Sequence, residues 1–369
     1  MSSVTLTPPT AKLSSASEVM TAGIDTHKHT HHVAMVDHLG RPVADRAFTT
    51  TTDGYRAIVA FMRANGHVDQ VGVEGTGSYG AGIARVPTAS EFTVVEVIRH
   101  NRQARRLRGK CDPLDAQQAA LSVVTGAHAV VPKSAIGHAE CLRILVGERR
   151  SAVKARSQTM NQIHALLITA ADLVRTTYRA LHGAKLINTL AASRPSSTTL
   201  ATPDTVARVA LKRLARRHQA LTVEITAIDA EFDDLTHDVN PRLRAMHGVG
   251  AVTAATLLAA AGDNPERVTT RATFAALAGV APMRASSGQR TRHRLSRGGN
   301  RHANAAIHRV TLLRLRHHEP RTRTPRHHSP RPTRPAKWDL TTIGASTLRG
   351  TTSGRSEHRL HEQGARRLR

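Results

Sequence analysis

The longest regular pattern in this sequence is a repeat of seven residues between positions 205 and 239. One apolar series is interrupted by a single polar side chain, and a second runs beside it: Leu211, His218, Ile225, Phe232 and Val239, then Leu214, Leu221, Ile228 and Leu235. A spacing of seven places each series on one stripe of a long α-helix, which must pack against another helix. Residues 138–170 form a second such helix, in which four apolar residues repeat in the same way: Val146, Val153, Met160 and Leu167.

These two segments predict a central α-helical coiled coil over residues 136–240. An intramolecular helical hairpin and a seam between two protomers both fit the pattern. His218 fits a seam position that sets the register better than it fits a ligand. The helix expected over residues 138–170 also carries several basic side chains that are suited to contact a polyanion: Arg149, Arg150, Lys154 and Arg156.

The charge of the chain indicates the kind of partner. Its 53 Lys and Arg residues against 27 Asp and Glu give a formal net charge of +26, which calls for a polyanion and favours nucleic acid over a membrane surface. The longest apolar run, 251–261, is too short to span a bilayer, and the N-terminus lacks the apolar core of a signal peptide. Cys111 and Cys141 do not suggest a disulfide framework. We expect a cytoplasmic, nucleoid-associated protein without a membrane segment.

The N-terminal part alternates strand and helix patterns. Three short strands are expected between residues 20 and 49, followed by elements in the order helix, strand, helix, strand, helix: from Thr52, Val71–Glu74, from Gly80, Phe92–Ile98, and from Asp112. This order is typical of an α/β RNase H-like (RuvC-like) domain. We assign it to residues 19–130, preceded by a disordered segment, 1–18.

Four acidic residues fall where this layout would bring them together. Asp112 and Asp115 lie three apart at the start of a helix that carries Pro113 in its first turn, so both carboxylates share one face. Alone, the pair reads as an N-cap and a first-turn acid favoured by the helix dipole. Asp25 on a central strand and Glu74 at the end of the fourth strand extend it to a group of four. Such a set suits Mg²⁺, and two such ions can hold a phosphodiester for in-line attack.

Two other patterns compete with this interpretation. Gly75–Gly80 reads GxGxxG, and Glu96 lies at the distance expected for a dinucleotide site. Three strands precede it and the chain is strongly basic, so we favour glycines that bring backbone close to a phosphate chain. Histidines cluster nearby, and alternation would place the first three on one strand face: His27, His29, His31, His32 and His38. Without cysteines they give little support to zinc.

A small α-helical domain is expected over residues 241–316. Residues 246–255 resemble the turn of a helix-hairpin-helix, in which Gly248 and Gly250 let backbone N–H groups approach a phosphate. After a further apolar helix, 274–280, comes Ser286-Ser287-Gly288 and then a run of arginines: Arg290, Arg292, Arg294, Arg297 and Arg301. The Ser-Gly pair predicts a turn. A serine among arginines is also suited to nucleophilic attack on phosphate.

Six stretches together resemble the DEDD transposases of bacterial insertion sequences, the family that includes the bridge-RNA-guided serine recombinases. They are GIDTHKHTHHVAMVD, VGVEGTGSYGAG, RGKCDPLDA, GVGAVTAATLLAAAGD and FAALAGVAPMRASSG with RLSRGGNRHAN. The resemblance covers about residues 20–316. It departs at Val86–Ser90, where we expect a helix to be interrupted, and after Glu319, where the family's basic terminal helix is missing.

The resemblance implies a RuvC-like domain with an acidic tetrad and a C-terminal transposase domain with a catalytic serine. The tetrad would be Asp25, Glu74, Asp112 and Asp115, and the nucleophile Ser287, with Ser286 as the alternative. An RNA encoded by the element would pair with donor and target DNA. The serine would join the cut strand beside metal-bound acids in a composite site between protomers, which requires a dimer or a dimer of dimers.

The sequence therefore predicts a DNA transposase or site-specific recombinase. The alternatives are an RNase H-like metal nuclease of the junction-resolvase type, in which the serine is inert, and an inactive nucleic-acid-binding remnant. The tail, 317–369, is basic and rich in proline, so we expect it to be disordered. A basic arm that grips nucleic acid and a shifted reading frame both explain it, and we favour the frameshift.

Overall fold

The computed structural model describes residues 19–89, 92–97, 111–126, 129–195, 202–264, 267–288, 290, 292–296 and 298–317. The chain divides into two compact units, Met1–Lys133 and Ser134–Arg369. The segment 1–18 and the tail 318–369, for which we predicted disorder, lie outside the described residues.

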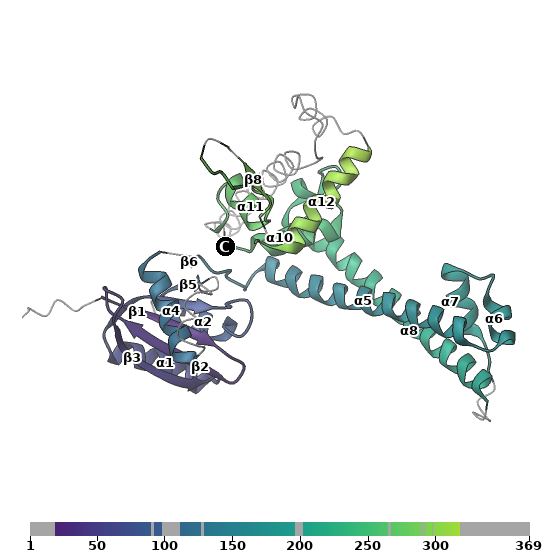
Figure 1. The fold of residues 1–369 in the computed structure, drawn as a ribbon, viewed down its shortest axis with the longest axis horizontal. Coiled ribbons are helices and arrows are strands. Elements are labelled where there is room, and N and C mark those ends of the chain that lie inside the picture. Colours follow the sequence, from purple (N-terminus) through teal and green to yellow (C-terminus); the bar gives the residue numbers. More distant parts are fainter. Residues whose placement is uncertain are drawn as a thin grey trace, which may run out of the picture. The chain divides into compact units, whose positions relative to one another are not determined.

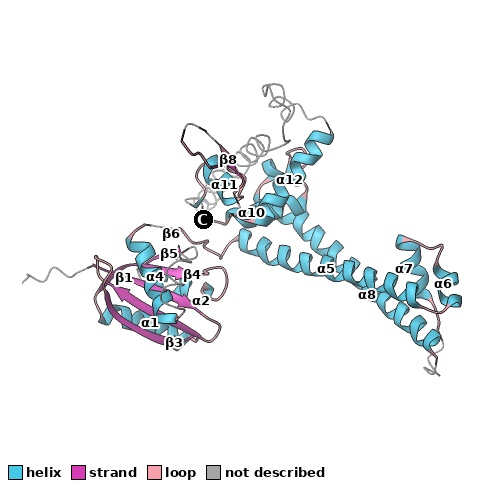
Figure 2. Ribbon diagram, in the orientation of Figure 1, coloured by secondary structure: helices cyan, strands magenta, loops and turns pink. Residues whose placement is uncertain are grey.

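The first unit is an α/β structure built around one sheet (Figures 1 and 2). Its strands are β1 (Val19–Thr26), β2 (Thr30–Val36), β3 (Pro42–Thr49), β4 (His67–Glu74), β5 (Thr93–Val97) and β6 (Ala129–Val130). The strand order is β3-β2-β1-β4-β5-β6. β1, β4 and β5 run parallel, whereas the pairs β1–β2, β2–β3 and β5–β6 are antiparallel. The predicted three-strand meander is confirmed, and β1 is central.

Helices cover both faces of this sheet. They are α1 (Thr52–Ala64), α2 (Ala81–Ala89) and α4 (Asp112–Val124). Side chains alternate along a strand, so Ala22 and Ile24 face one way, into the core that β1 shares with α1 and α2. Gly23 and Asp25 face the other way, towards α4. The acid thus lies on the face that α4 covers.

Two glycines allow α4 to lie directly on the sheet. A Cβ atom at Gly23 would come within 2.2 Å of the Ala116 carbonyl oxygen, and one at Gly72 within 2.8 Å of the Ala119 carbonyl oxygen. Gly23 and Gly72 are paired in the parallel ladder between β1 and β4. The helix presents small side chains, such as the fully buried Ala116 and Ala119, so the two backbones approach closely.

Two local predictions for this unit need correction. The N-cap of α4 is Cys111, so Asp112 is the first helical residue and not the cap. Pro113 does lie in the first turn, where its missing N–H costs no helical hydrogen bond. We expected Val86–Ser90 to interrupt a helix, but α2 continues through Pro87 to Ala89. Pro87 falls in the last turn, where only one i→i−4 bond is lost.

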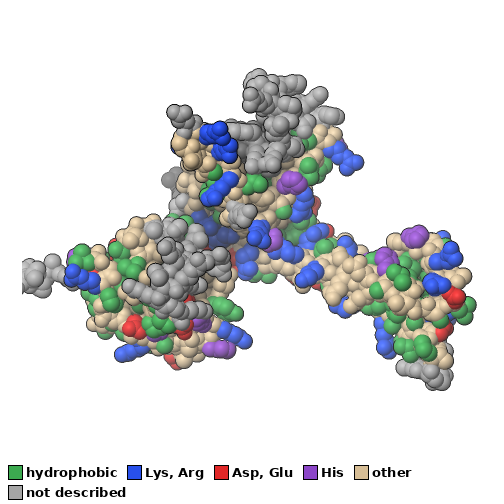
Figure 3. All heavy atoms as spheres, viewed as in Figure 1, with side chains coloured by type: hydrophobic (Ala, Val, Ile, Leu, Met, Phe, Trp, Pro, Cys, Tyr) green, Lys and Arg blue, Asp and Glu red, His purple; other side chains and the backbone are tan. Residues whose placement is uncertain are grey.

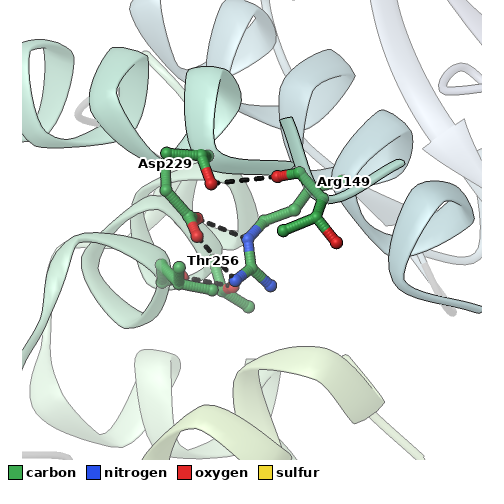
Figure 4. A network of polar contacts seen from close by, with 6 residues as sticks. Arg149, Asp229 and Thr256 are labelled. Atoms are coloured by element: carbon green, nitrogen blue, oxygen red, sulfur yellow. Dashed lines mark hydrogen bonds and ion pairs between the residues drawn. The ribbon is translucent and has the colours of Figure 1, made fainter. Parts of the chain in front are cut away.

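The second unit contains the two long predicted helices, α5 (His138–Thr169) and α8 (Pro203–Val239). They pack on each other within one chain and run antiparallel. Arg149 near the start of α5 forms a bidentate ion pair with Asp229 near the end of α8, with N···O distances of 2.5 and 3.0 Å (Figure 4). Ile163, towards the end of α5, shares a cluster with Leu211, near the start of α8. This packing is the intramolecular hairpin, one of the two arrangements that fit the sequence pattern.

The heptad pattern marks the packed side of α8. Leu211, Ile225, Ile228 and Phe232 are buried, whereas Val223, outside both series, is 70% exposed. Beyond the Ile163 end of the hairpin, two short helices complete a small core, α6 (Asp172–Tyr178) and α7 (Gly183–Ala192).

A compact group of helices forms around the other end of the hairpin. The elements are α9 (Pro241–Arg244), α10 (Ala251–Ala261), α11 (Arg271–Leu277), β7 (Met283–Arg284), β8 (His293–Arg294) and α12 (Arg301–Arg316). The core of this group includes Phe274 and Ile307 together with Leu142 of α5 and Phe232 of α8. The Asp263 carboxylate, just after α10, accepts a hydrogen bond of 2.7 Å from a backbone N–H in the first turn of α5. Among the described helices, none is long and apolar enough to cross a membrane.

The contact between β1 and α4 predicts a large effect of one methyl group. Gly23→Ala should lower the free energy of unfolding by about 1–3 kcal/mol, because the added Cβ collides with helix backbone that cannot rotate away. Urea unfolding followed by circular dichroism measures the change. The matched control is Gly77→Ala, where nothing lies within 4 Å of the new methyl group. Equal unfolding midpoints for the two variants would contradict this account of the packing.

Candidate metal centre and serine hairpin

Asp25 is the central residue of the predicted acidic group. It lies near the end of β1, and only 4% of its surface is exposed. Its Oδ2 atom is buried and receives no hydrogen bond from the described residues. A buried carboxylate oxygen without a donor is costly unless a cation or a proton balances it.

Helix α4 brings two further acids to this point. Asp112 and Asp115 lie in its first turn, and the helix N-terminus also carries a partial positive charge that favours carboxylates. Asp115 is 2% exposed, whereas the side chain of Asp112 is about half exposed (49%). The helix thus supplies one buried acid and one that solvent can reach.

Glu74 is the fourth acid, and it ends β4 next to β1, as predicted. The Thr26 hydroxyl donates a hydrogen bond of 3.0 Å to the Glu74 carbonyl oxygen, which ties the ends of the two strands together. The glycine loop then turns sharply. Gly75 has a φ of +60°, and a Cβ at Gly80 would lie 2.5 Å from the same carbonyl oxygen. These glycines therefore form the tight turn after Glu74.

Burial and the other three acids raise the pKa of Asp25. Burial raises the pKa of the Asp25 carboxyl above its ordinary range, His27 lowers it, and Glu74, Asp115 and Asp112 each raise it. Like charges and desolvation both disfavour the ionised form. Glu74 and Asp115 are near enough to raise the pKa of Asp25, but of the predicted acids only Asp25 and Asp112 belong, among the described residues, to a group whose ligand atoms lie within 4.8 Å of one another.

His27 also lies in this cluster, although we did not predict it as one of the site residues. Its Nε2 atom is 3.4 Å from Asp25 Oδ2 and 3.3 Å from Asp112 Oδ1. Ligand atoms of Asp25, His27 and Asp112 all lie within 4.8 Å of one another. The available signal was its position two residues after an acid, at the point where a strand ends.

The alternation that we predicted for the histidines is wrong. β1 ends at Thr26 and β2 begins at Thr30, so His27 and His29 lie in the turn between them and not on one strand face. His31 is fully buried and stacks on Tyr55, with ring centroids 5.8 Å apart. His32 pairs with Asp45 at 2.7 Å. The zinc alternative assumed that His27, His29 and His31 share one strand face, and the structure does not place them so.

These residues fit a divalent cation. The cluster offers carboxylate oxygens, one of them buried without a hydrogen-bond donor among the described residues, and one imidazole nitrogen. Carboxylates suit Mg²⁺ and Mn²⁺, and a half-exposed Asp112 leaves room for water ligands.

The predicted serine turn lies at the tip of a short hairpin in the second unit. β7 and β8 pair antiparallel, and Ser287 and Arg290 face each other, with backbone N–H···O hydrogen bonds of 3.3 and 3.2 Å. Gly288 has a φ of +56°, which this tight turn requires. The Ser286 hydroxyl accepts a hydrogen bond of 3.3 Å from the backbone N–H of Arg292. The turn is confirmed, and both serines are exposed.

The basic residues expected to contact nucleic acid are exposed in this same part of the chain. They are Arg290, Arg292, Arg294 and Arg301, while Arg297 lies outside the described residues. Gly248, with a φ of +81°, and Gly250, the N-cap of α10, lie in the predicted turn between α9 and α10. Lys and Arg side chains are also visible along the long helices in Figure 3.

Comparison with known families agrees with these two sites. The family model for DEDD transposases of the IS110 type matches residues 22–170. A second model, Transposase IS116/IS110/IS902 family, matches residues 240–326. The chain belongs to the DEDD transposase family of insertion sequences. No protein of curated function matches this transposase chain.

The two matched regions of the transposase coincide with the two candidate sites. The first contains all four acids and His27, and the second contains the serine hairpin and its arginines. The family assignment makes DNA the substrate class and DNA processing the type of activity.

The electrostatics of the acidic group predict that it destabilises the metal-free transposase. A raised pKa means that the folded chain holds the Asp25 proton more tightly than the unfolded chain, so stability falls as pH rises above about 4. Asp25→Asn should therefore raise the melting temperature in EDTA, and by more at pH 8 than near pH 4, where the unfolded carboxyl is itself half protonated. Mg²⁺ should stabilise the native protein and not the variant.

Thermal unfolding measures both effects. Asp69→Asn is the matched control, because Asp69 is exposed on β4 and should give no pH-dependent difference. A variant at Asp25 that is less stable than the native protein in EDTA at both pH values would show that the acids do not repel one another.

Proposed function

We propose that this transposase cuts and rejoins DNA with a divalent-metal centre held by four acids and with Ser287 as nucleophile. The observation that carries the proposal is the convergence of acids from β1, β4 and α4 on the buried Asp25. The strand order 3-2-1-4-5, with an antiparallel meander followed by two parallel strands, supports an RNase H-like (RuvC-like) domain.

The division of labour follows the chain. We propose that residues 19–130 form the catalytic DEDD domain, 136–240 the coiled-coil region, 241–316 the transposase domain with the serine, and 317–369 a basic tail. In the first domain Asp25, Glu74, Asp112 and Asp115 would hold Mg²⁺. The bound ion would supply positive charge for a phosphodiester that becomes more negative during attack. The acids themselves fix where the scissile phosphate lies.

Ser287 would supply the attacking oxygen. Its Oγ would form a bond to phosphorus while the bond from phosphorus to one bridging ester oxygen of the DNA breaks. That oxygen would leave with a proton, as the hydroxyl group at the new strand end. The serine hydroxyl proton is lost in the same step. Exposure at a hairpin tip among arginines supports this role, because the hydroxyl can reach a phosphate whose charge Arg290 and Arg292 would offset. Ser286 is the weaker candidate, since its hydroxyl already accepts a backbone hydrogen bond.

The partners would be donor and target DNA and a guide RNA encoded by the element. The net charge of +26 supports a large nucleic-acid contact. Two protomers or a dimer of dimers would be needed if the serine of one chain meets the acids of another, as the family resemblance implies. Association with the nucleoid would follow from the DNA substrate.

One cleavage assay tests the chemistry. With labelled DNA carrying the ends of the element, the native protein should give strand cleavage and a covalent protein–DNA adduct in Mg²⁺. Ser287→Ala should lose the adduct, and Asp25→Asn or Asp115→Asn should lose cleavage while nucleic-acid binding stays within about threefold, because the basic surface is unchanged.

Ser286→Ala is the matched control and should keep the adduct. If that variant alone loses it, the nucleophile is the neighbouring serine. Cleavage without any adduct in the native protein would favour the metal-nuclease alternative. Binding without cleavage would favour the inactive remnant.

Bound RNA is the second testable part of the proposal. Protein purified at moderate salt should carry one discrete RNA species, and the affinity for that RNA should fall steeply as salt rises, because binding releases counterions. Sequencing of the copurified RNA identifies it. Recovery of only heterogeneous fragments that wash off at low salt would contradict a specific guide.

A further inference from the structure

His27 is polar, close to the acids and absent from the acidic tetrad. It is the first residue after β1, and its backbone N–H donates a hydrogen bond of 3.0 Å to the Thr30 carbonyl oxygen, which closes the turn to β2. The ring is held on a short, ordered turn, with its Nε2 atom between Asp25 and Asp112.

The distances around Nε2 are those between neighbouring ligands of one metal ion. Ligands at about 2.1 Å from a metal lie about 3.0 Å apart when octahedral neighbours and about 3.4 Å apart when tetrahedral. Nε2 is 3.3 Å from Asp112 Oδ1 and 3.4 Å from Asp25 Oδ2. The ligand atoms of all three residues lie within 4.8 Å of one another, so one ion is within reach of all of them.

An independent observation indicates that a cation belongs there. Asp25 is 96% buried (4% exposed), and its Oδ2 atom, the one next to His27, receives no hydrogen bond from the described part of the chain. A neutral imidazole with its hydrogen on Nδ1 leaves the Nε2 lone pair free for a metal. In the other tautomer Nε2 would instead donate the 3.3 Å hydrogen bond to Asp112 Oδ1. With the hydrogen on Nδ1, the imidazole and the Asp25 carboxylate would both present unshared electron pairs to the same small space.

We propose that His27 is a nitrogen ligand of the metal centre, which makes this a mixed carboxylate–imidazole site. The inference rests on the proposed function, since it needs the acids to bind a metal. Imidazole binds Mn²⁺ and later transition metals better than it binds Mg²⁺, which prefers oxygen. His27 thus shifts the preference of the centre from Mg²⁺ towards Mn²⁺.

Mn²⁺ is the probe for the test, because its electron spin reports bound nitrogen directly. The full-length protein with Mn²⁺ should show ¹⁴N coupling of a directly bound imidazole in pulsed electron paramagnetic resonance. His27→Gln should remove that coupling and weaken Mn²⁺ binding about 10- to 100-fold. The dissociation constant for Mg²⁺ should rise less than that for Mn²⁺. The dissociation constant for Mg²⁺ divided by that for Mn²⁺ should therefore fall towards one.

His29→Gln is the matched control, since His29 lies in the same turn and is exposed. It should retain the coupling and the native affinities. Mn²⁺ that binds the native protein without ¹⁴N coupling, or coupling that survives His27→Gln, would overturn the role of His27 and leave the acidic centre standing. No Mn²⁺ binding by the native protein would overturn the acidic centre as well.

Discussion

The close contact of α4 with β1 and β4 is the constraint on which the candidate metal centre depends. Gly23 and Gly72 are paired across the two parallel strands, and both let helix backbone approach where any side chain would hold it away. Asp25 and Glu74 each follow two residues later on the same face. The two strands thus carry the same arrangement, a glycine that allows the helix to approach and then an acid on the same face.

This arrangement makes the ionised form of Asp25 unfavourable in the metal-free protein, as expected if a cation binds there. Burial and neighbouring carboxylates both disfavour a charged Asp25, and a helix packed a few ångströms further out would relieve the repulsion. The Gly–Ala contact prevents that relief. A fold that forces acids together without a counterion gains stability when a cation binds, which couples metal affinity to the packing of α4. His27 extends the same logic, because the turn after β1 places a nitrogen beside the oxygen that burial leaves without a donor.

The second unit is a packed group of helices that carries Ser287 and several arginines on an exposed hairpin. The antiparallel α5–α8 pair buries one stripe of each helix and is joined by the Arg149–Asp229 ion pair. The Asp263 carboxylate, which follows α10, accepts a hydrogen bond from the first turn of α5. The serine hairpin is short, exposed and closed by Gly288. The exposed Ser287 hydroxyl, which we propose as the nucleophile, lies at the tip of this two-stranded turn, where a substrate can reach it.

The sequence by itself determined the order of strands and helices, the meander, the two long helices and the serine turn. These follow from local signals, such as the seven-residue repeat and Ser287-Gly288, that depend on neighbours in the chain. It also selected the four acids by residue type and position. Only the tertiary structure decided that α8 packs on α5 of its own chain and that Cys111 caps α4. It also decided that His27 lies beside Asp25 and Asp112 and not on a strand face with the other histidines. The first and last of these outcomes depend on contacts between residues far apart in the chain, such as Arg149 with Asp229 and His27 with Asp112, and such contacts leave no periodic trace in the sequence.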